Sequence, residues 1–365
     1  MKNVTLFTQI RLGALDLSHR VVMAPLTRMR AALPGEIPTA LMAEYYGQRA
    51  SAGGLLVTEG ATICEMGRGY LGAPGIYDDA QEAGWRALTQ AVHAKGGFVF
   101  LQLWHTGRSS HVEFTGGLPP VGPSAGAYDG VVCTREGWVP ASPARALLTQ
   151  EIPDVIAAYR RAAERARAAG FDGVEIHGAN GYLLDQFLQD GSNHRDDDYG
   201  GPVENRARLL GETCAAVVGV WGPGRVGVRL SPSGRFNGMQ DSNPDATFTY
   251  AARMLAGFPL AYLHVVEPRI VGVEERAEGL APVAARQIKA AFGGPVIAAG
   301  GFDRASAAAI LASGEADLVA FGRAFIANPD LPRRLAEGAE LNSYDRNTFY
   351  GGDARGYTDY PALPA

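Results

Sequence analysis

Three polar side chains follow a short apolar run near the middle of the chain. The run FDGVEI, at residues 171–176, is typical of a buried strand, and His177, Asn180 and Tyr182 come within six positions as it ends. A buried core rarely contains three such groups together, because each of them needs a hydrogen-bond partner. An imidazole, an amide and a phenol can together hydrogen-bond a ligand and transfer a proton. We therefore interpret this strand end as part of a functional site.

A buried arginine lies at the end of another apolar run. Alternate residues of a strand point to opposite faces, so in VGVRLS, residues 226–231, the side chain of Arg229 points inward while the valines and the leucine point outward. An unpaired buried cation costs several kcal/mol, so Arg229 needs an electron-rich partner. The candidates are Glu175, Glu59 or a bound ligand. Other inward positions near strand ends are Pro25, Thr27, Gln102 and Trp104.

Glycines follow two late apolar runs. The segments AAGGF and FGRAF carry Gly300, Gly301, Gly322 and Arg323. Glycines let backbone N–H groups approach an anion closely, and an adjacent cation adds charge, as in the phosphate sites of many barrels. Glycines that only close the barrel are the alternative. Together with the inward arginine and glutamine, this pattern favours a planar, phosphorylated cofactor with polar edges.

Eight short apolar runs, separated by amphipathic stretches, position these groups. The runs are VVMAP at 21, LLVTEG at 55, FVFLQLW at 98, GVEIH at 173, VGVRLS at 226, AYLHVVE at 261, PVIAAGG at 295 and LVAFGR at 318. Strands that alternate with helices imply a parallel sheet, and eight such units predict an α/β fold of the (β/α)₈ TIM-barrel type. An open doubly wound sheet is the alternative. No G-x-G-x-x-G follows the first run, which counts against its dinucleotide-binding form.

Two segments depart from this repeat. Residues 5–20 predict a small β-hairpin that caps the bottom of the barrel, and residues 106–149 form a Gly/Pro-rich loop excursion after the third strand. Loops of this length are often lids or binding loops, so we expect the excursion to cover the barrel's C-terminal mouth. No linker composition divides the chain, which predicts a single domain over residues 1–365.

Composition excludes several classes of protein. The 365 residues are 47% hydrophobic and carry a formal charge of -5, which indicates a globular protein without a basic face for nucleic acid. No apolar stretch reaches 18 residues, so we expect a cytoplasmic protein without a membrane span. The three cysteines are far apart in the sequence, which argues against disulfides, iron–sulfur clusters and structural zinc.

In order and spacing, the motifs resemble the Old Yellow Enzyme family of FMN-dependent ene-reductases, in particular its bacterial members. The resemblance covers nearly the full length: APLTRMR, LQLWHTGR, HGANGYLLDQFL, DDDYGGPVENRARLL, AAGGF, FGRAFIANPDL and FYGGDARGYTDYP. It implies that FMN is bound and that NAD(P)H is the hydride donor. The isoalloxazine contacts would be Pro25, Thr27, Gly60, Gln102 and Arg229, and the phosphate contacts Gly300, Gly301, Gly322 and Arg323. The substrate pocket would contain Tyr70, Trp104, Ile270 and Tyr350.

The resemblance also implies a ping-pong reaction on a small-molecule substrate. Flavin N5 would deliver hydride to the Cβ atom of an α,β-unsaturated carbonyl or nitroalkene, His177 and Asn180 would hydrogen-bond the activating oxygen, and Tyr182 would protonate Cα. Reduction of nitrate esters or nitroaromatics is an implied side activity. No metal is implied, and the protein would be a monomer or a homodimer.

Two positions depart from the family pattern. Gly60 replaces the alanine of many relatives, which we expect to loosen the packing on the flavin. Arg269 and Ile270 stand where close relatives commonly carry a tryptophan over the pocket, so a different substrate range is expected.

Three other functions compete with this interpretation. A Schiff-base aldolase needs a lysine at a strand's C-terminal end, and none of the three lysines, at 2, 95 and 289, is placed there. A metal-dependent hydrolase would use His105, His177 and His264, although His105 and His264 are more simply interpreted as structural. A flavin-binding sensor with little turnover would not need the intact His177, Asn180 and Tyr182.

Overall fold

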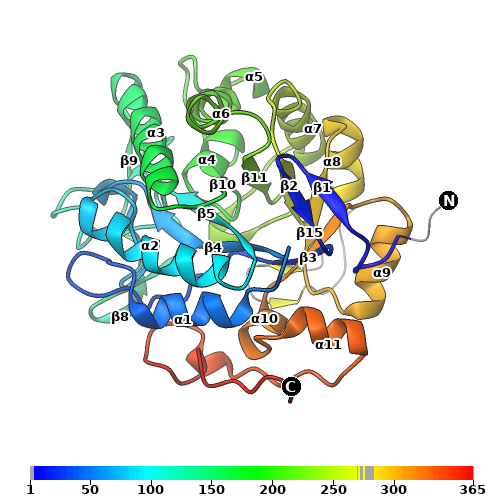
Figure 1. Cartoon of the computed structure of the whole chain (residues 1–365). Coiled ribbons are helices and arrows are strands. Elements are labelled where there is room, and N and C mark those ends of the chain that lie inside the picture. Colours follow the sequence, from blue (N-terminus) through cyan, green and yellow to red (C-terminus); the bar gives the residue numbers. More distant parts are fainter. Residues whose placement is uncertain (1–3, 269, 272–273, 276–282, 365) are drawn as a thin grey trace.

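Eight parallel strands close into a barrel, as the computed structural model shows for residues 4–268, 270–271, 274–275 and 283–364 (Figure 1). The predicted (β/α)₈ TIM barrel is confirmed, and all eight apolar runs are its strands. In chain order these are β3 (Val21–Met23), β4 (Leu55–Thr62), β5 (Phe98–Trp104), β10 (Gly173–Gly178), β11 (Val226–Leu230), β12 (Tyr262–Val266), β15 (Val296–Ala299) and β16 (Leu318–Phe321).

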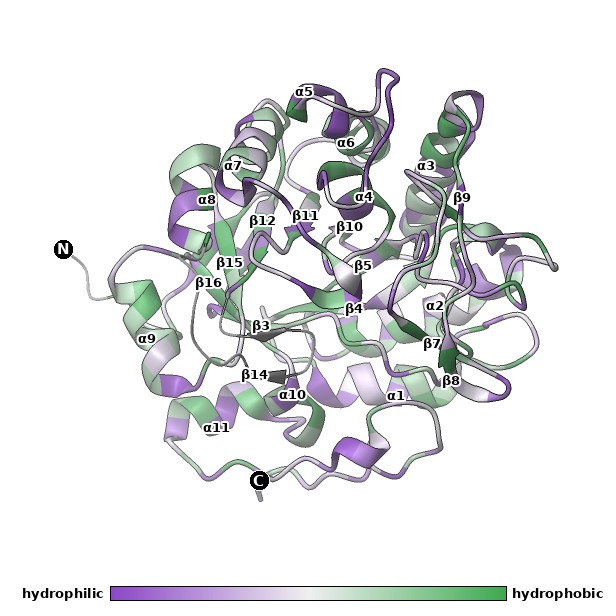
Figure 2. Cartoon of the chain, turned by 180° about the vertical axis from the view of Figure 1, so that it is seen from behind, coloured by the Kyte–Doolittle hydropathy of each residue, from purple (hydrophilic) through white to green (hydrophobic). Residues whose placement is uncertain are grey.

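Helices surround the barrel. Figure 2 shows largely hydrophobic strands inside a ring of helices that carry both hydrophobic and hydrophilic residues, as expected for helices with one buried face. Asp303 caps α9, since its side chain accepts a hydrogen bond from the Ser306 amide. The helices are α1 (Ala40–Arg49), α2 (Asp79–His93), α3 (Ile152–Ala168), α4 (Leu183–Leu188), α5 (Val203–Arg206), α6 (Arg208–Trp221), α7 (Pro244–Leu255), α8 (Ala285–Phe292), α9 (Arg304–Ala312), α10 (Arg323–Ala327) and α11 (Leu331–Glu337).

The N-terminal hairpin closes the bottom of the barrel, as predicted. Its strands β1 (Ile10–Leu12) and β2 (Leu15–Leu17) pair antiparallel. Three hairpin leucines, at 12, 15 and 17, pack in one cluster with Phe100, Tyr262 and other apolar residues of the barrel interior. The turn approaches the chain ahead of β11 so closely that a Cβ atom on Gly13 would lie 2.3 Å from the carbonyl oxygen of Gly224. Only glycine fits there.

The excursion after β5 contains four short strands, β6 (Val121–Gly122), β7 (Val131–Thr134), β8 (Gly137–Pro140) and β9 (Arg145–Ala146). β7 and β8 form an antiparallel hairpin. It is fixed to the segment after β4, because the Leu71 amide donates a hydrogen bond of 2.8 Å to the Cys133 carbonyl. A further pair, β13 (Ile270–Val271) and β14 (Glu274–Glu275), follows β12.

The inward and outward positions agree with the alternation in the sequence. Val226, Val228 and Leu230 belong to the cluster that packs barrel against helices, and Gln102 and Arg229 are buried on the other face. Parallel strands all end at the same side of a barrel, which in TIM-barrel enzymes carries the active site. The fold thus brings the polar strand ends together.

Candidate active site

A cavity of about 1150 Å³ opens at the C-terminal end of the barrel. Its walls come from the ends of β3, β11, β15 and β16, from the turn after β10, from the loop at 235–238, from the β7–β8 hairpin and from residues 341–350. Segments far apart in the sequence therefore share one site, and the excursion covers it as predicted. Most of the site residues expected from the sequence line it: Pro25, Thr27, Tyr70, Asn180, Tyr182, Arg229, Gly300, Gly301, Gly322, Arg323 and Tyr350.

Four other expected residues, Gly60, Gln102, Trp104 and His177, do not line this cavity. His177, Gln102 and Trp104 are buried directly behind its wall, and Trp104 and His177 stack with ring centroids 6.4 Å apart. Gly60 lies on β4 beside Trp104. The backbone of Ile270 begins β13, whereas its side chain and all of Arg269 lie outside the described residues.

The turn after β10 is held in one conformation. Asn180 adopts a left-handed backbone, with φ 57°, which asparagine tolerates better than most residues. Its amide donates to the Ser231 hydroxyl at 2.7 Å, and its carbonyl accepts from the Asn237 side chain at 2.9 Å. At Gly181 a Cβ atom would lie 2.6 Å from the Cβ of Asn237. The turn thereby fixes where the Asn180 and Tyr182 side chains enter the cavity.

His177, buried behind the wall, is held neutral. Burial, followed by the electrostatic effects of Arg229 and His264, lowers its pKa well below the ordinary value. Its Nδ1 atom is buried and has no hydrogen-bond partner among the described residues. Since a buried polar atom normally has a partner, this nitrogen indicates a ligand or a water molecule at the site.

Tyr182 keeps its proton. Its ring lies 5.0 Å from that of His177, and burial raises the pKa of its phenol far above the ordinary value. Its hydroxyl hydrogen-bonds Tyr70 at 3.5 Å. A protonated phenol in a cavity wall can serve as a general acid.

A buried carboxylate organises the interior just below the mouth. Glu175 accepts hydrogen bonds from the Gln102 side chain at 2.8 Å, His264 Nδ1 at 2.9 Å and the Tyr262 hydroxyl at 3.1 Å. Burial opposes its ionisation, but these donors and the nearby Arg229 hold the pKa of Glu175 below its ordinary value. Because the Gln102 Nε2 atom is occupied by this carboxylate, the amide presents its oxygen elsewhere. Gln102 is thereby available as an acceptor.

Arg229 itself makes no ion pair with the described residues. Glu175 is committed to its three donors, and Glu59 accepts from the backbone amides of Arg28 and Met29. The Nε atom of Arg229 is buried without a partner, and the residue lines the cavity. The hypothesis of an internal salt bridge to Glu175 or Glu59 is therefore wrong, and the arginine is available to an electron-rich ligand.

His105 and His264 each have a hydrogen-bond partner within the protein, which agrees with the simpler interpretation that they are structural. His264 is fixed by its bond to Glu175. His105 Nδ1 accepts from the Gly107 amide at 3.0 Å, and burial lowers its pKa to about 3. Within the described ranges, no group of three histidine, cysteine, aspartate or glutamate side chains is arranged to hold a metal ion.

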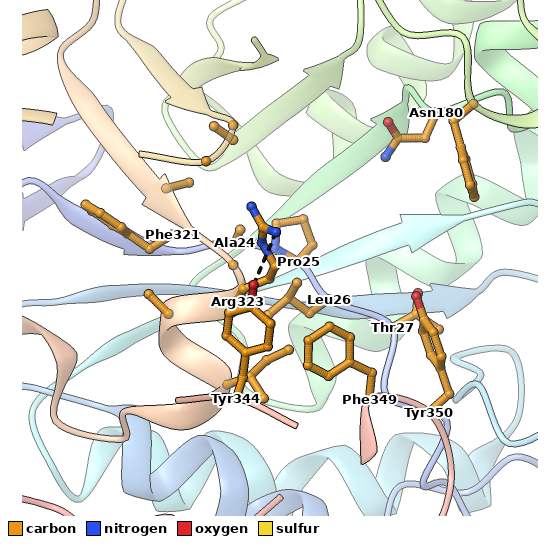
Figure 3. A pocket seen from close by; sticks show the side chains of 18 of the residues that line it. Ala24, Pro25, Leu26, Thr27, Asn180, Phe321, Arg323, Tyr344, Phe349 and Tyr350 are labelled. Carbon is orange, nitrogen blue, oxygen red and sulfur yellow. Dashed lines mark hydrogen bonds between the residues drawn. The ribbon is translucent and has the colours of Figure 1, made fainter. Parts of the chain in front are cut away.

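The phosphate cradle expected from the glycines lies at another side of the cavity. Gly300 and Gly301 have φ of 144° and 63°, and a Cβ on Gly300 would lie 2.9 Å from that of Glu267. Arg323 donates a hydrogen bond of 3.3 Å to the Tyr344 hydroxyl, as Figure 3 shows, with Asn180 set well apart from them. The cavity thus combines a glycine-rich, cationic side with a polar wall.

These features fit FMN. A planar ring beside Arg229 would give the unpaired Nε atom a partner, and a phosphate would find the glycine backbone together with Arg323. The volume of the cavity, about 1150 Å³, is larger than the range of about 300–1,000 Å³ that is common for the site of a single ligand. A ring and a substrate can therefore be accommodated together.

Gly60 has a local explanation. A Cβ atom at this position would lie 2.8 Å from the indole ring of Trp104, so the tryptophan occupies the space that an alanine would need. On this side of Gly60, the indole of Trp104 therefore fills the space that the missing methyl group would leave.

Sequence reasoning missed several lining residues. They are Leu26, Asp129, Val131, Trp138, Arg235, Phe236, Asn237, Leu341, Tyr344 and Phe349. Asp129, Val131 and Trp138 stood in the excursion that was expected to cover the mouth, and Leu26 lies between the predicted Pro25 and Thr27. Phe349 begins the quoted motif FYGGDARGYTDYP, whereas the remaining residues, at 235–237, 341 and 344, lie in segments whose path depends on tertiary packing.

Comparison with known proteins agrees with this geometry. The model of the NADH:flavin oxidoreductase / NADH oxidase family matches residues 5–342. The chain belongs to this family. The prediction of Old Yellow Enzyme membership is thus confirmed, and the protein is an FMN-dependent oxidoreductase that uses a nicotinamide coenzyme.

Individual family members are similar over almost their whole length. Flavin oxidoreductase hxnT of Emericella nidulans is 45% identical, covering 98% of this chain and 97% of the relative. 12-Oxophytodienoate reductase 1 of Oryza sativa subsp. japonica is 47% identical, covering 99% and 93%. Morphinone reductase in complex with tetrahydroNAD superposes with a TM-score of 0.92 at 49% identity, covering 99% and 98%. The Old Yellow Enzyme homologue of Zymomonas mobilis gives 0.94 at 45%, covering 99% and 100%.

The lengths and composition of the helices bear on whether the chain can cross a membrane. Of the helices within the described ranges, none is both long and apolar enough to span a bilayer. A cytoplasmic location and a monomeric or homodimeric state stay predictions.

Proposed function

We propose that this flavoprotein reduces the activated C=C bond of α,β-unsaturated carbonyls and nitroalkenes at the expense of NAD(P)H. Bound FMN supplies a hydride carrier between the nicotinamide and the alkene. Pro25, Thr27, Gly60, Gln102 and Arg229 would contact its ring, and Gly300, Gly301, Gly322 and Arg323 would hold its phosphate. Relatives named morphinone reductase and 12-oxophytodienoate reductase support a conjugated substrate.

The observation that carries the proposal is that hydrogen-bond donors and a proton donor lie close together at the C-terminal end of β10. A neutral His177 at the end of β10 lies beside a protonated Tyr182, and the amide of Asn180 belongs to the same turn as Tyr182. His177 and Asn180 would donate to the activating oxygen, on which charge develops as hydride reaches Cβ. In comparable sites, one such donor contributes about 3–4 kcal/mol.

Tyr182 would then protonate Cα. The product gains one hydride and one proton across the double bond, and the phenol recovers its proton from solvent. Its high pKa keeps it protonated at neutral pH, so it can donate to a carbanion-like carbon. Tyr70, whose hydroxyl is 3.5 Å away, would hold the phenol in place.

Isotopic labelling tests both transfers. We expect 2-cyclohexenone to yield one cyclohexanone per NAD(P)H, with deuterium at Cβ from a labelled nicotinamide and at Cα from D₂O. NADH and NADPH would be compared in parallel. Coenzyme consumption without saturated product would contradict the proposal and indicate another electron acceptor. Reduction of nitrate esters or nitroaromatics stays a prediction of the family resemblance.

A further inference from the structure

Exposed apolar side chains gather around the active-site cavity. In the described part of the chain, ten large hydrophobic residues are prominently exposed, and six of them line this cavity: Val131, Trp138, Phe236, Leu341, Tyr344 and Tyr350. Clustered exposed apolar surface of this kind marks a binding site, whereas scattered single residues need no explanation. Leu341 and Tyr344 lie at the Arg323 side. The other four, Val131, Trp138, Phe236 and Tyr350, we call the apolar mouth.

Trp138 is the largest member of the apolar mouth and is held in place by the hairpin. It lies on β8 opposite Cys133 of β7, and Cys133 is fixed to the chain at Leu71 by a backbone hydrogen bond of 2.8 Å. Nevertheless Trp138 remains 50% exposed. A positioned indole with half its surface in water can gain free energy when a ligand covers it.

A series of aromatic contacts connects this indole to the reacting wall. Trp138 meets Tyr350 at 5.5 Å and Tyr70 at 6.1 Å between ring centroids. Tyr70 in turn meets Tyr182 at 6.5 Å and Trp104 at 5.5 Å. The exposed face of Trp138 is thus one tyrosine away from the proposed proton donor. A substituent on a substrate whose alkene lies near Tyr182 can reach it.

The charges at the mouth do not favour an ionic substituent. Asp129 and Arg235, of opposite sign, both line the cavity. Neither charge dominates, so recognition there depends on apolar and aromatic surface.

We infer that the preferred alkene carries a flat, uncharged apolar substituent, such as an aryl ring, which packs on Trp138 in the apolar mouth. This inference rests on the proposed function and deepens it by naming the substrate class. Aromatic packing adds to simple burial of area, so a flat ring should bind better than a saturated ring of similar size.

The test uses the FMN-loaded protein and three enones with the same reacting group. They are 2-cyclohexenone, 4-phenyl-2-cyclohexenone and 4-cyclohexyl-2-cyclohexenone, whose substituents are attached to a saturated carbon and leave the alkene's activation nearly unchanged. We expect kcat/KM to follow phenyl above cyclohexyl above unsubstituted. In Trp138→Ala, the preference for the phenyl over the unsubstituted enone should fall about tenfold, mainly through KM. Trp138→Phe should retain most of it.

A binding measurement separates recognition from turnover. The Kd of 4-phenylcyclohexanone, a saturated product that cannot react, should rise about tenfold in Trp138→Ala. Leu118→Ala is the matched control, because Leu118 is an equally exposed apolar residue of the same excursion that does not line the cavity. It should leave the preference unchanged.

The outcomes distinguish two failures. Reduction of all three enones with equal preference, or a preference that survives Trp138→Ala, would overturn this inference while leaving the proposed function intact. Failure to reduce any enone, with NAD(P)H still oxidised, would overturn the proposed function itself.

Discussion

The two ends of the barrel interior differ although the same strands build both. On β5 the inward residues change from Phe100 at the bottom to Gln102 near the mouth, and on β12 they change from Tyr262 to His264. The bottom packs apolar side chains against the N-terminal hairpin, whereas the top holds a buried carboxylate, an unpaired arginine and a neutral imidazole. The bottom of the barrel therefore contributes mainly to stability, and the mouth carries the polar groups that can do chemistry. The change takes place within a few residues along each strand.

The largest effect is expected at the top. Tyr182→Phe should slow reoxidation of the reduced protein by an enone about 10²- to 10⁴-fold, because the proton donor is lost, and should leave reduction by NAD(P)H nearly unchanged. Stopped-flow measurement of the two half-reactions separates them. Equal slowing of both halves would mean that Tyr182 supports the site only through packing.

At the bottom of the barrel we expect a substitution to lower the free energy of unfolding without impairing either half-reaction. Phe100→Ala removes a fully buried ring from the cluster beneath the mouth and should lower the free energy of unfolding by about 3–5 kcal/mol. Urea unfolding measures it, with the exposed Leu33→Ala as control, for which a change within about 0.5 kcal/mol is expected. If folded Phe100→Ala protein lost the alkene half-reaction selectively, the division between the two ends would be wrong.

The pKa values of two buried glutamates, Glu59 and Glu175, are shifted in opposite directions. Burial raises the pKa of Glu59 to about 7, despite two backbone donors, whereas Glu175 stays ionised among its donors. A carboxyl whose pKa is raised on folding stabilises the fold below its unfolded pKa and loses that contribution as pH rises through the folded value. Stability supplied by Glu59 should therefore decline between pH 4.5 and about 7.

Glu59→Gln should flatten this decline. Comparing the free energies of unfolding of wild type and variant at pH 5 and pH 8 measures it, with an expected difference on the order of 1 to 3 kcal/mol. Identical pH slopes for the two proteins would show that Glu59 is already ionised when the protein is folded.

The smallest effect concerns Glu175. Glu175→Gln removes the charged acceptor of the hydrogen bonds from Gln102, Tyr262 and His264. We expect FMN affinity to fall about tenfold, because Gln102 loses its fixed orientation. Equilibrium dialysis and the position of the flavin absorbance bands report this independently of turnover. A lower melting temperature with unchanged affinity and spectrum would reduce Glu175 to a purely structural residue.

Much of the architecture was predictable because it depends on local alternation. Apolar runs identified all eight barrel strands, and inward positions near their ends identified Arg229 and Gln102. The partners of Glu175 were not predictable, since closure of the barrel brings Tyr262 and His264 to it from β12, which lies two strands away from β10. Trp138 and Phe236 were missed because their direction depends on the hairpin register and on how distant loops pack over the mouth.

The central claim is that this barrel passes a hydride from a nicotinamide through FMN to an activated alkene. An anaerobic visible spectrum of the purified protein, titrated with NADPH and then with 2-cyclohexenone, tests it most directly. We expect a flavin band that NADPH bleaches and the enone restores. A colourless protein that takes up no FMN, or a bleached one that the enone fails to reoxidise, would contradict it.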